Sequence, residues 1–286
     1  MFDRFVAVDW SANSTPKLGR DSIWIADGHQ TGAVTLTNLA TRAAAEAFLV
    51  EVFESDSASS MLVGVDFSLG YPKGTAASLG LTGTPWSTMW ALLAESIVDD
   101  ERNANNRFAV AATLNRRFTG GAAPFWGCPP AQAAPTLAPT KPRPPSSLAE
   151  WRTVETQLRA SGRRPFSSWQ LLGAGAVGSQ SLLGIPMIVR LRERLGERVQ
   201  VWPFTTGFAV PAPDEGVIVV AEVWPSMLTI DTDGTVRDSA QVATMVSWLA
   251  EADRDGRLEA LLSPALSSDV SAVAVAEEGW VLGVVP

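Results

Sequence analysis

The chain has 286 residues, of which 46% are hydrophobic and 18% charged, so it can bury a core and is not disordered throughout. No apolar run approaches the roughly 18 residues that a membrane-spanning helix needs, and residues 1–4 are not typical of a secretory signal. Cys128 and His29 are the only cysteine and histidine, which excludes an internal disulfide, a cysteine-based zinc cage and a multi-histidine metal site. We therefore expect a cytoplasmic protein without a membrane partner.

The net charge of −8 is unevenly distributed along the chain. Residues 1–100 carry a net charge of −7, residues 101–200 of +9 and residues 201–286 of −10. The acidic ends argue against a broad face for duplex DNA, because affinity for a phosphate backbone comes from clustered positive charge. The arginine-rich middle suits a short nucleic acid or a small phosphate ester, because arginine is a good ligand for phosphate.

The first third of the chain predicts three strands, a helix and a fourth strand. The three strands cover residues 5–10, 21–27 and 33–39, and the turn between the last two is typical of a β-hairpin. Thr41 is the expected N-cap of the helix that follows. Residues 61–66 are a continuous apolar run ending on an acid, as in a strand covered on both faces.

From about residue 85 the pattern changes to helices and irregular chain. We expect helices over 85–98, 103–118, 148–160 and about 176–195, with a long loop over 122–147 that contains eight prolines. Strands over 199–202 and 216–223 follow, then a helix that Asp238 caps and that runs to about residue 252, and a final helix over about 263–277.

This order of elements predicts an α/β fold with a mixed sheet of three antiparallel strands followed by parallel strands, flanked by helices. Residues 1–84 and 198–286 are the expected core. Residues 85–197 are the expected insertion, helical and rich in proline and arginine.

Three acidic residues end buried strands of the predicted sheet. Asp9, Asp66 and Glu222 each lie at or near the carboxyl end of an apolar run. Ligands of α/β proteins gather at that edge of the sheet, and a buried carboxylate is costly unless it is paired or bound to a metal. None of the three segments has a nearby lysine or arginine, so we expect a divalent cation, and oxygen ligands favour Mg²⁺ or Mn²⁺. The alternative is that each acid caps the helix after its strand.

Three segments resemble the ribonuclease H-like fold, and in particular a poorly characterised bacterial domain family of predicted ribonuclease H-like nucleases. They are residues 6–9 (VAVD), 65–72 (VDFSLGYP) and 221–226 (AEVWPS). The second is similar to the family's Asp-x-x-Leu-Gly-aromatic-Pro signature, and the third to its Glu-x-aromatic-Pro signature. The resemblance covers the two ends of the chain, about 170 residues, and leaves out the middle.

The resemblance implies a site and a reaction. The family places a further acid in its C-terminal helical region, for which Asp269 is the best match, with Asp253 and Asp255 as competitors. Asp9 would bridge two metal ions about 4 Å apart, and Asp66, Glu222 and Asp269 would complete the set. The implied function is metal-dependent phosphodiester hydrolysis, and the alternative on the same fold is a binding protein without catalysis.

Polar residues near these motifs and in the middle of the chain are candidate contacts for an anionic substrate. They are also compatible with ordinary loop polarity and solvated helix faces. The candidates are Ser11, Arg20, Ser68, Lys73, Arg102, Arg107, Arg163 and Arg164.

A glycine-rich segment offers a different function. Residues 173–178 (GAGAVG) satisfy the G-x-G-x-x-G pattern and precede an expected helix, as in a dinucleotide-binding oxidoreductase. The pattern requires a long buried strand before it and an acid at the end of the next strand, and the sequence predicts neither. A structural turn, or a loop that approaches a substrate phosphate, is the favoured interpretation.

Overall fold

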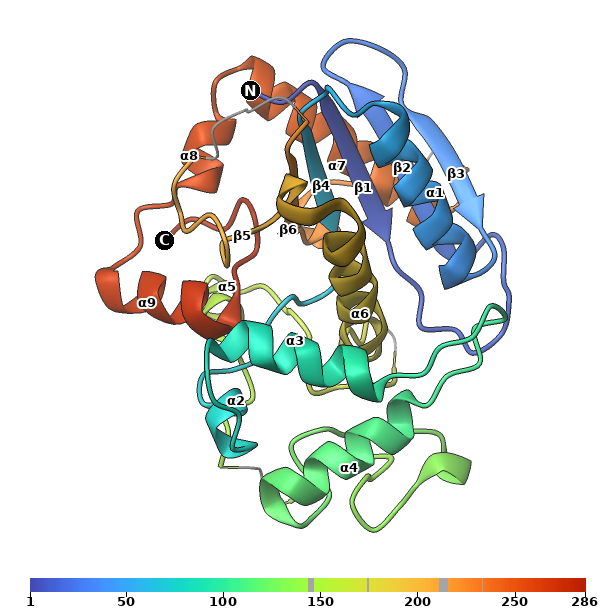
Figure 1. Cartoon of the computed structure of the whole chain (residues 1–286), viewed down its shortest axis with the longest axis vertical. Helices are drawn as coiled ribbons and strands as arrows, with labels where there is room; N and C mark the ends of the chain where they lie inside the picture. The colour runs from blue at the N-terminus through green and yellow to red at the C-terminus, as the bar shows by residue number, and fades with distance from the viewer. Residues whose placement is uncertain (144–146, 174, 211–215, 233) are drawn as a thin grey trace.

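The computed structural model describes residues 1–143, 147–173, 175–210, 216–232 and 234–286. Its centre is a six-stranded sheet with the order β3-β2-β1-β4-β6-β5 (Figure 1). The strands are β1 (Arg4–Asp9), β2 (Ile23–His29), β3 (Thr35–Leu39), β4 (Met61–Val65), β5 (Val199–Trp202) and β6 (Ile218–Glu222). The pairs β1–β2 and β2–β3 are antiparallel, and β1–β4, β4–β6 and β5–β6 are parallel. The expected mixed α/β sheet is confirmed.

The sheet has a hydrophobic core on each face, and β1 contributes to both. Val6 and Val8 belong to one core, whereas Phe5 and Ala7 belong to the other. This division follows from the two-residue period of a strand, which sends successive side chains to opposite faces. A strand covered on both faces must be apolar throughout, and this explains the unbroken apolar runs of β1, β4 and β6.

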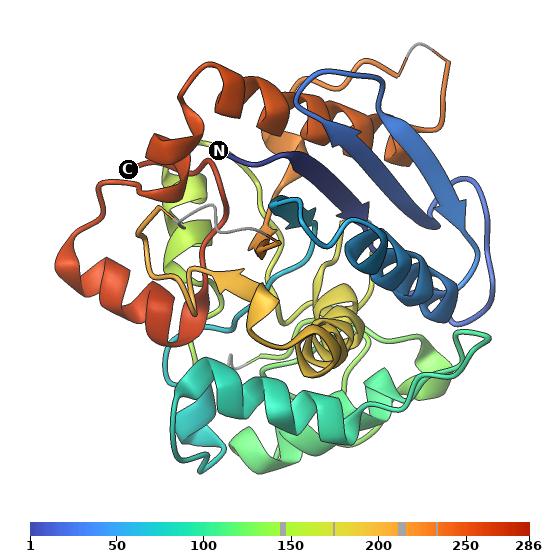
Figure 2. The ribbon, with the colours of Figure 1, turned by 45° about the horizontal axis from the view of Figure 1, so that its top comes forward.

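Helices cover both faces of the sheet. On one side α7 (Arg237–Arg254) packs its buried residues, among them Met245 and Leu249, against β1 and β2. On the other side lie α1 (Arg42–Ser55) and α6 (Gly178–Leu195), which contribute Phe53 and Ile185 to the second core. Figure 2 shows α6 nearly end-on, between the sheet and α3 (Pro85–Ser96).

The remaining elements are short except α4, which packs against α6 (Figure 1). Among the described residues, none of the helices is long and apolar enough to cross a membrane. The other elements are α2 (Thr75–Ser78), α4 (Arg107–Thr119), η1 (Pro130–Gln132), α5 (Thr153–Ala160), η2 (Gly196–Arg198), η3 (Pro225–Met227), α8 (Leu258–Leu262), α9 (Ser268–Val273) and the π-helical turn η4 (Ala274–Glu278).

Several expected helix boundaries differ from the observed ones. Thr41 caps α1 as predicted, because its hydroxyl accepts from the Ala44 N–H. The helix expected from residue 103 begins only at Arg107, because Asn103 has a φ of 69° and cannot continue a right-handed helix. Asp238 does not cap α7, which already includes Arg237. Part of the proline-rich loop, residues 144–146, lies outside the described residues.

Candidate functional site

Asp9 and Asp66 lie side by side at the carboxyl edge of the sheet. Val8 of β1 pairs with Val65 of β4, so the next residue of each parallel strand is an aspartate. The Asp66 N–H donates to the Val8 carbonyl at 3.2 Å, and the Trp10 N–H donates to Asp66 Oδ1 at 2.8 Å. The two carboxyl groups are within hydrogen-bonding reach of each other. The structure therefore brings together two of the predicted site residues.

This pair of carboxyl groups is electrostatically strained. Burial raises the pKa of Asp9 well above its ordinary value, and the neighbouring charge of Asp66 raises it further. Burial also raises the pKa of Asp66 to about 6, although the hydrogen bond from the Trp10 N–H favours its ionised form. No lysine or arginine of the described chain forms a salt bridge with either residue. Ionising both carboxyl groups is therefore costly, and no cationic side chain among the described residues offsets that cost.

Two further aspartates add negative charge around the pair. Asp238 raises the pKa of both Asp9 and Asp66, and Asp21 raises that of Asp9. The Asp238 carboxylate accepts a hydrogen bond from the Asp21 N–H at 2.6 Å, which connects the first turn of α7 to the loop after β1. The sequence marked Asp238 only as a helix cap. The packing of α7 on β1 and β2, which brings it to the site, depends on tertiary structure.

Gln180 is a site residue that the sequence analysis missed. Its Nε2 donates to the Trp10 carbonyl and, at 3.3 Å, to Asp66 Oδ2. It lies in the first turn of α6, directly after the glycine-rich segment, of which Ala174 is outside the described residues. The residues before this segment form an isolated bridge between Gln170 and Trp126 and are not part of a named strand. The first turn of α6 therefore contacts the aspartate pair at the ends of β1 and β4, through the hydrogen bond from Gln180 to Asp66.

Glu222 lies in an ion pair and not beside the two aspartates. Arg152 donates from Nη1 to Glu222 Oε2 at 2.7 Å and from Nη2 to Oε1 at 2.5 Å. The Leu69 N–H also donates to Oε2, at 3.1 Å. Burial raises the pKa of Glu222, while Arg152 opposes this shift. Both of its carboxylate oxygens are occupied within the protein.

Arg152 is the centre of a buried network. Its side chain is fully buried, and it also donates to Glu155 and to the Glu278 carbonyl. The Glu278 carboxylate in turn accepts from the Lys73 and Thr153 N–H groups. This network joins β6, α5 and the C-terminal turn η4. Sequence analysis had no way to detect it, because Arg152 is distant in the chain from every motif.

The three candidates for the fourth carboxylate lie in different surroundings. Asp269 is an exposed residue in the first turn of α9. Asp253 accepts hydrogen bonds from the Phe2 N–H and from Gln30. Asp255 is exposed and pairs with Arg257 at 3.2 Å. In the part of the chain that the structure describes, no group of three or more His, Cys, Asp and Glu side chains is arranged to hold a metal ion.

The proposed substrate contacts are also dispersed. Ser11 lies in the loop after β1, where its hydroxyl donates to the Asp21 carbonyl. Arg107 is buried and hydrogen-bonded to Ser179, the neighbour of Gln180. Ser68 is buried, two residues beyond Asp66. The remaining candidates are exposed: Arg20, Lys73, Arg102, Arg163 and Arg164.

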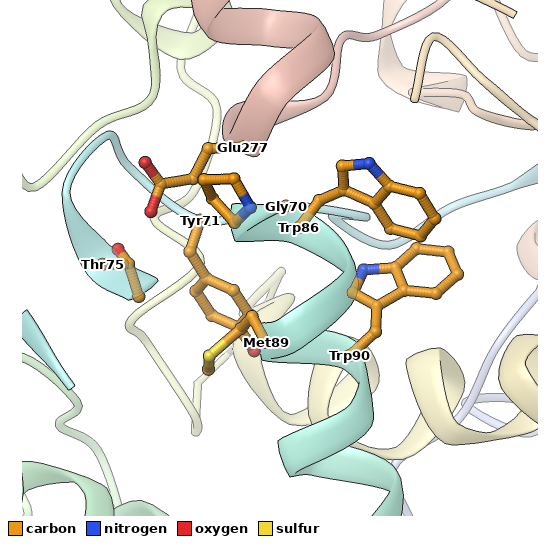
Figure 3. Close-up of a pocket in the computed structure, with 8 residues that line it drawn as sticks. Gly70, Tyr71, Thr75, Trp86, Met89, Trp90 and Glu277 are labelled. Atoms are coloured by element: carbon orange, nitrogen blue, oxygen red, sulfur yellow. The ribbon is translucent and has the colours of Figure 1, made fainter. Parts of the chain in front are cut away.

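A small hollow lies between α3 and the loop after β4 (Figure 3). It is lined by Tyr71, Trp86, Met89 and Trp90, with Glu277 at its edge, and its volume is about 10 Å³. That volume holds about one water molecule. The Glu277 carboxylate accepts from the Gly74 and Ala76 N–H groups and is part of the structure that closes the loop. The hollow is too small for a substrate.

Comparison with known proteins found no matching family model, no matching curated protein and no matching solved structure. The conclusions about this chain therefore depend on its own residues and geometry.

Proposed function

We propose that this protein is a divalent-metal-dependent phosphodiester hydrolase whose Mg²⁺ or Mn²⁺ is held by Asp9 and Asp66. The observation that carries the proposal is the convergence of these two carboxyl groups at the ends of adjacent parallel strands, without a cationic partner among the described residues. Ionising both buried carboxyl groups is unfavourable, and a divalent cation at this position would favour their ionised forms. The donor set consists of oxygens, which is the set that Mg²⁺ and Mn²⁺ prefer.

The strand arrangement supports a ribonuclease H-like assignment as part of this proposal. Three antiparallel strands followed by parallel ones, with the acids on the central β1 and on β4, agree with the motif resemblance. On this assignment the stretch 85–197, with its proline-rich loop and its arginines, is an insertion into the core. Asp238 replaces Asp269 as the nearest additional acid, because its charge acts on both members of the pair.

The protein's own residues have separate tasks in this proposal. Asp9 and Asp66 provide the ligand oxygens, while Gln180 and the Trp10 N–H fix the orientation of Asp66. In the reaction a water oxygen bonds to phosphorus, the ester P–O bond breaks, and a proton from water ends on the departing oxygen. A bound cation supplies positive charge against the phosphoryl oxygens and acidifies water. Glu222 stabilises the neighbouring loop through Arg152 and Leu69.

Calorimetric titration with Mn²⁺ tests the proposal directly. We expect saturable binding to the wild-type protein and loss of that binding in Asp9→Asn and Asp66→Asn. Asp255→Asn is the matched control, because Asp255 is an exposed acid with a surface partner. The same four proteins are then assayed for hydrolysis of bis(p-nitrophenyl) phosphate with Mn²⁺. Wild-type Mn²⁺ affinity in Asp66→Asn, or activity that persists in EDTA, would overturn the proposal.

A further inference from the structure

Arg107 is a buried arginine without an acidic partner. It is the first residue of α4 and is 7% exposed. None of the carboxylates in the described parts of the chain lies within salt-bridge distance of its guanidinium. A buried charge is costly without an opposite charge, so most arginines in this position have an anionic partner.

The guanidinium of Arg107 lies over the Phe108 ring, with Cζ 4.3 Å from the ring centroid, but the surrounding charges give it no carboxylate of its own. Arg42 lies close enough to repel it, and Asp99 close enough to attract it. Asp99, however, is engaged by Arg42, which donates to both of its carboxylate oxygens. The cluster of Arg42, Arg107 and Asp99 therefore has one positive charge in excess. Burial and the repulsion from Arg42 lower the pKa of Arg107 to about 10, so the guanidinium is still charged at neutral pH.

The hydrogen bonds of Arg107 use Nε and Nη1 and leave Nη2 available for a ligand. Nε donates to Ser179 Oγ at 3.0 Å, and Nη1 donates to Ser14 Oγ at 3.0 Å and to Asn105 Oδ1 at 2.7 Å. Nη2 has no hydrogen bond to any described residue. The Ser179 hydroxyl is committed to the Leu171 carbonyl. The exposed Ser14 hydroxyl only accepts in the described structure, so its proton remains available.

Two chain segments connect this cationic position to the aspartate pair. Ser179 precedes Gln180, which donates to Asp66, and consecutive Cα atoms are only about 3.8 Å apart. Ser14 belongs to the loop that leaves β1 directly after Asp9. The first turn of α6 and the loop after β1 therefore connect the position of Arg107 to the aspartate pair.

We propose that Arg107 and Ser14 bind the phosphate next to the scissile one, so that the substrate is a short single strand of nucleic acid and not a phosphate monoester. This inference rests on the proposed function. An internal phosphodiester of a strand always has a neighbouring phosphate, whereas a small monoester has none. Guanidinium and hydroxyl donors match the oxygens of a phosphate, and Ser179 acts as a positioning residue for the guanidinium. One phosphate-binding position is enough for a short strand but not for a long duplex. This agrees with the net charge of −8, which disfavours a broad nucleic-acid surface.

Strand binding without metal tests this inference separately from hydrolysis. The probe is a fluorescein-labelled hexathymidylate, and its Kd is measured by anisotropy in EDTA over a range of salt concentrations. We expect Ser14→Ala and Arg107→Lys to weaken binding about 5- to 20-fold. The slope of log Kd against log salt should fall by about 0.7 in Arg107→Gln, which removes one cationic phosphate contact, and should stay unchanged in Ser14→Ala and Arg107→Lys, which remove no positive charge. Arg116→Gln is the control, since Arg116 is an exposed arginine in the last turn of α4, and its Kd should stay within twofold.

Substrate selectivity provides a second readout. With Mn²⁺ present, Ser14→Ala should raise the KM for the oligonucleotide and leave that for bis(p-nitrophenyl) phosphate, a diester without a neighbouring phosphate, unchanged. Ser14 is exposed, so this variant keeps the test valid even if Arg107→Lys does not fold. Unchanged strand affinity in Ser14→Ala, or equal turnover of a phosphate monoester and the strand, would overturn the inference. Strand binding without Mn²⁺-dependent cleavage would instead overturn the proposed function and leave the phosphate position intact.

Discussion

Arg152 and Glu222 face each other as a two-pronged ion pair inside the protein, with Arg152 Nη1 at 2.7 Å from Glu222 Oε2 and Nη2 at 2.5 Å from Oε1. Glu222 ends β6 and Arg152 precedes α5, so the pair connects the sheet to a segment 70 residues away in sequence. Glu222 therefore connects the end of β6 to Arg152 and to the loop after β4.

The first prediction concerns this ion pair. Glu222→Gln should lower the free energy of unfolding by about 3 kcal/mol, because it leaves part of the buried Arg152 charge uncompensated. Urea denaturation measures this loss, and Mn²⁺ titration of the folded variant should give the wild-type Kd. Asp255→Asn, which breaks an exposed pair, should cost less than about 1 kcal/mol. A fully stable Glu222→Gln that no longer binds Mn²⁺ would show that Glu222 is a ligand.

The second prediction is the pH dependence of the metal-free protein. The pKa of Asp66 is raised from 3.8 to about 6 in the folded state, so the folded protein retains a proton that the unfolded chain has lost. The free energy of unfolding should therefore fall as pH rises from about 4 to 6, by roughly 3 kcal/mol for a shift of this size. Denaturation in EDTA at pH 4.5, 6 and 7.5 measures the slope.

Asp66→Asn provides the matched comparison for this slope. Because it removes the titrating group, the metal-free variant should be more stable than the wild type at pH 7.5 and equally stable near pH 4. Mn²⁺ should stabilise the wild type at pH 7.5 and have no effect on the variant. Identical pH profiles for the two proteins would mean that folding does not raise the pKa of Asp66.

The third prediction concerns Gln180. Gln180→Ala removes the side-chain donor to Asp66 Oδ2 and to the Trp10 carbonyl. We expect a 10- to 100-fold loss of Mn²⁺ affinity, the usual cost of removing a hydrogen bond that orients a metal ligand. Gln132→Ala, at an exposed position in η1, is the control.

The fourth prediction tests the packing that holds α6 at the site. Gly184 lies in α6 against the Phe67 ring, and a Cβ at this position would be 2.3 Å from Phe67 Cζ. Gly184→Ala should lower the free energy of unfolding by about 1–3 kcal/mol through overpacking, despite the higher helix propensity of alanine. Phe67→Leu in the same chain should relieve part of that cost, and urea denaturation of the single and double variants measures the coupling. If the effects of the two substitutions on the free energy of unfolding are additive, the proposed contact between positions 184 and 67 is wrong.

The sequence predicted the sheet well because β1, β4 and β6 are apolar on both faces, a pattern that depends on local residues alone. It also predicted that Asp9 and Asp66 meet, since both end neighbouring parallel strands. It could not predict the partner of Glu222, because Arg152 reaches it from a distant segment that shows no motif. The position of Asp238 depends on how α7 packs across β1 and β2, which a helix-capping pattern does not contain.

Residues outside the site hold the loop after β1 in place through hydrogen bonds to its backbone. Arg42 Nη1 donates to the Ser11 and Asn13 carbonyls at 2.9 and 2.7 Å, and Asn103 Nδ2 donates to the Thr15 carbonyl at 3.3 Å. The backbone on both sides of Ser14 is thus ordered before any ligand arrives. Binding at this loop would lose little conformational entropy, because the ordering is already complete in the free protein. Helix α1 and the turn between α3 and α4 therefore contribute to affinity without touching the substrate.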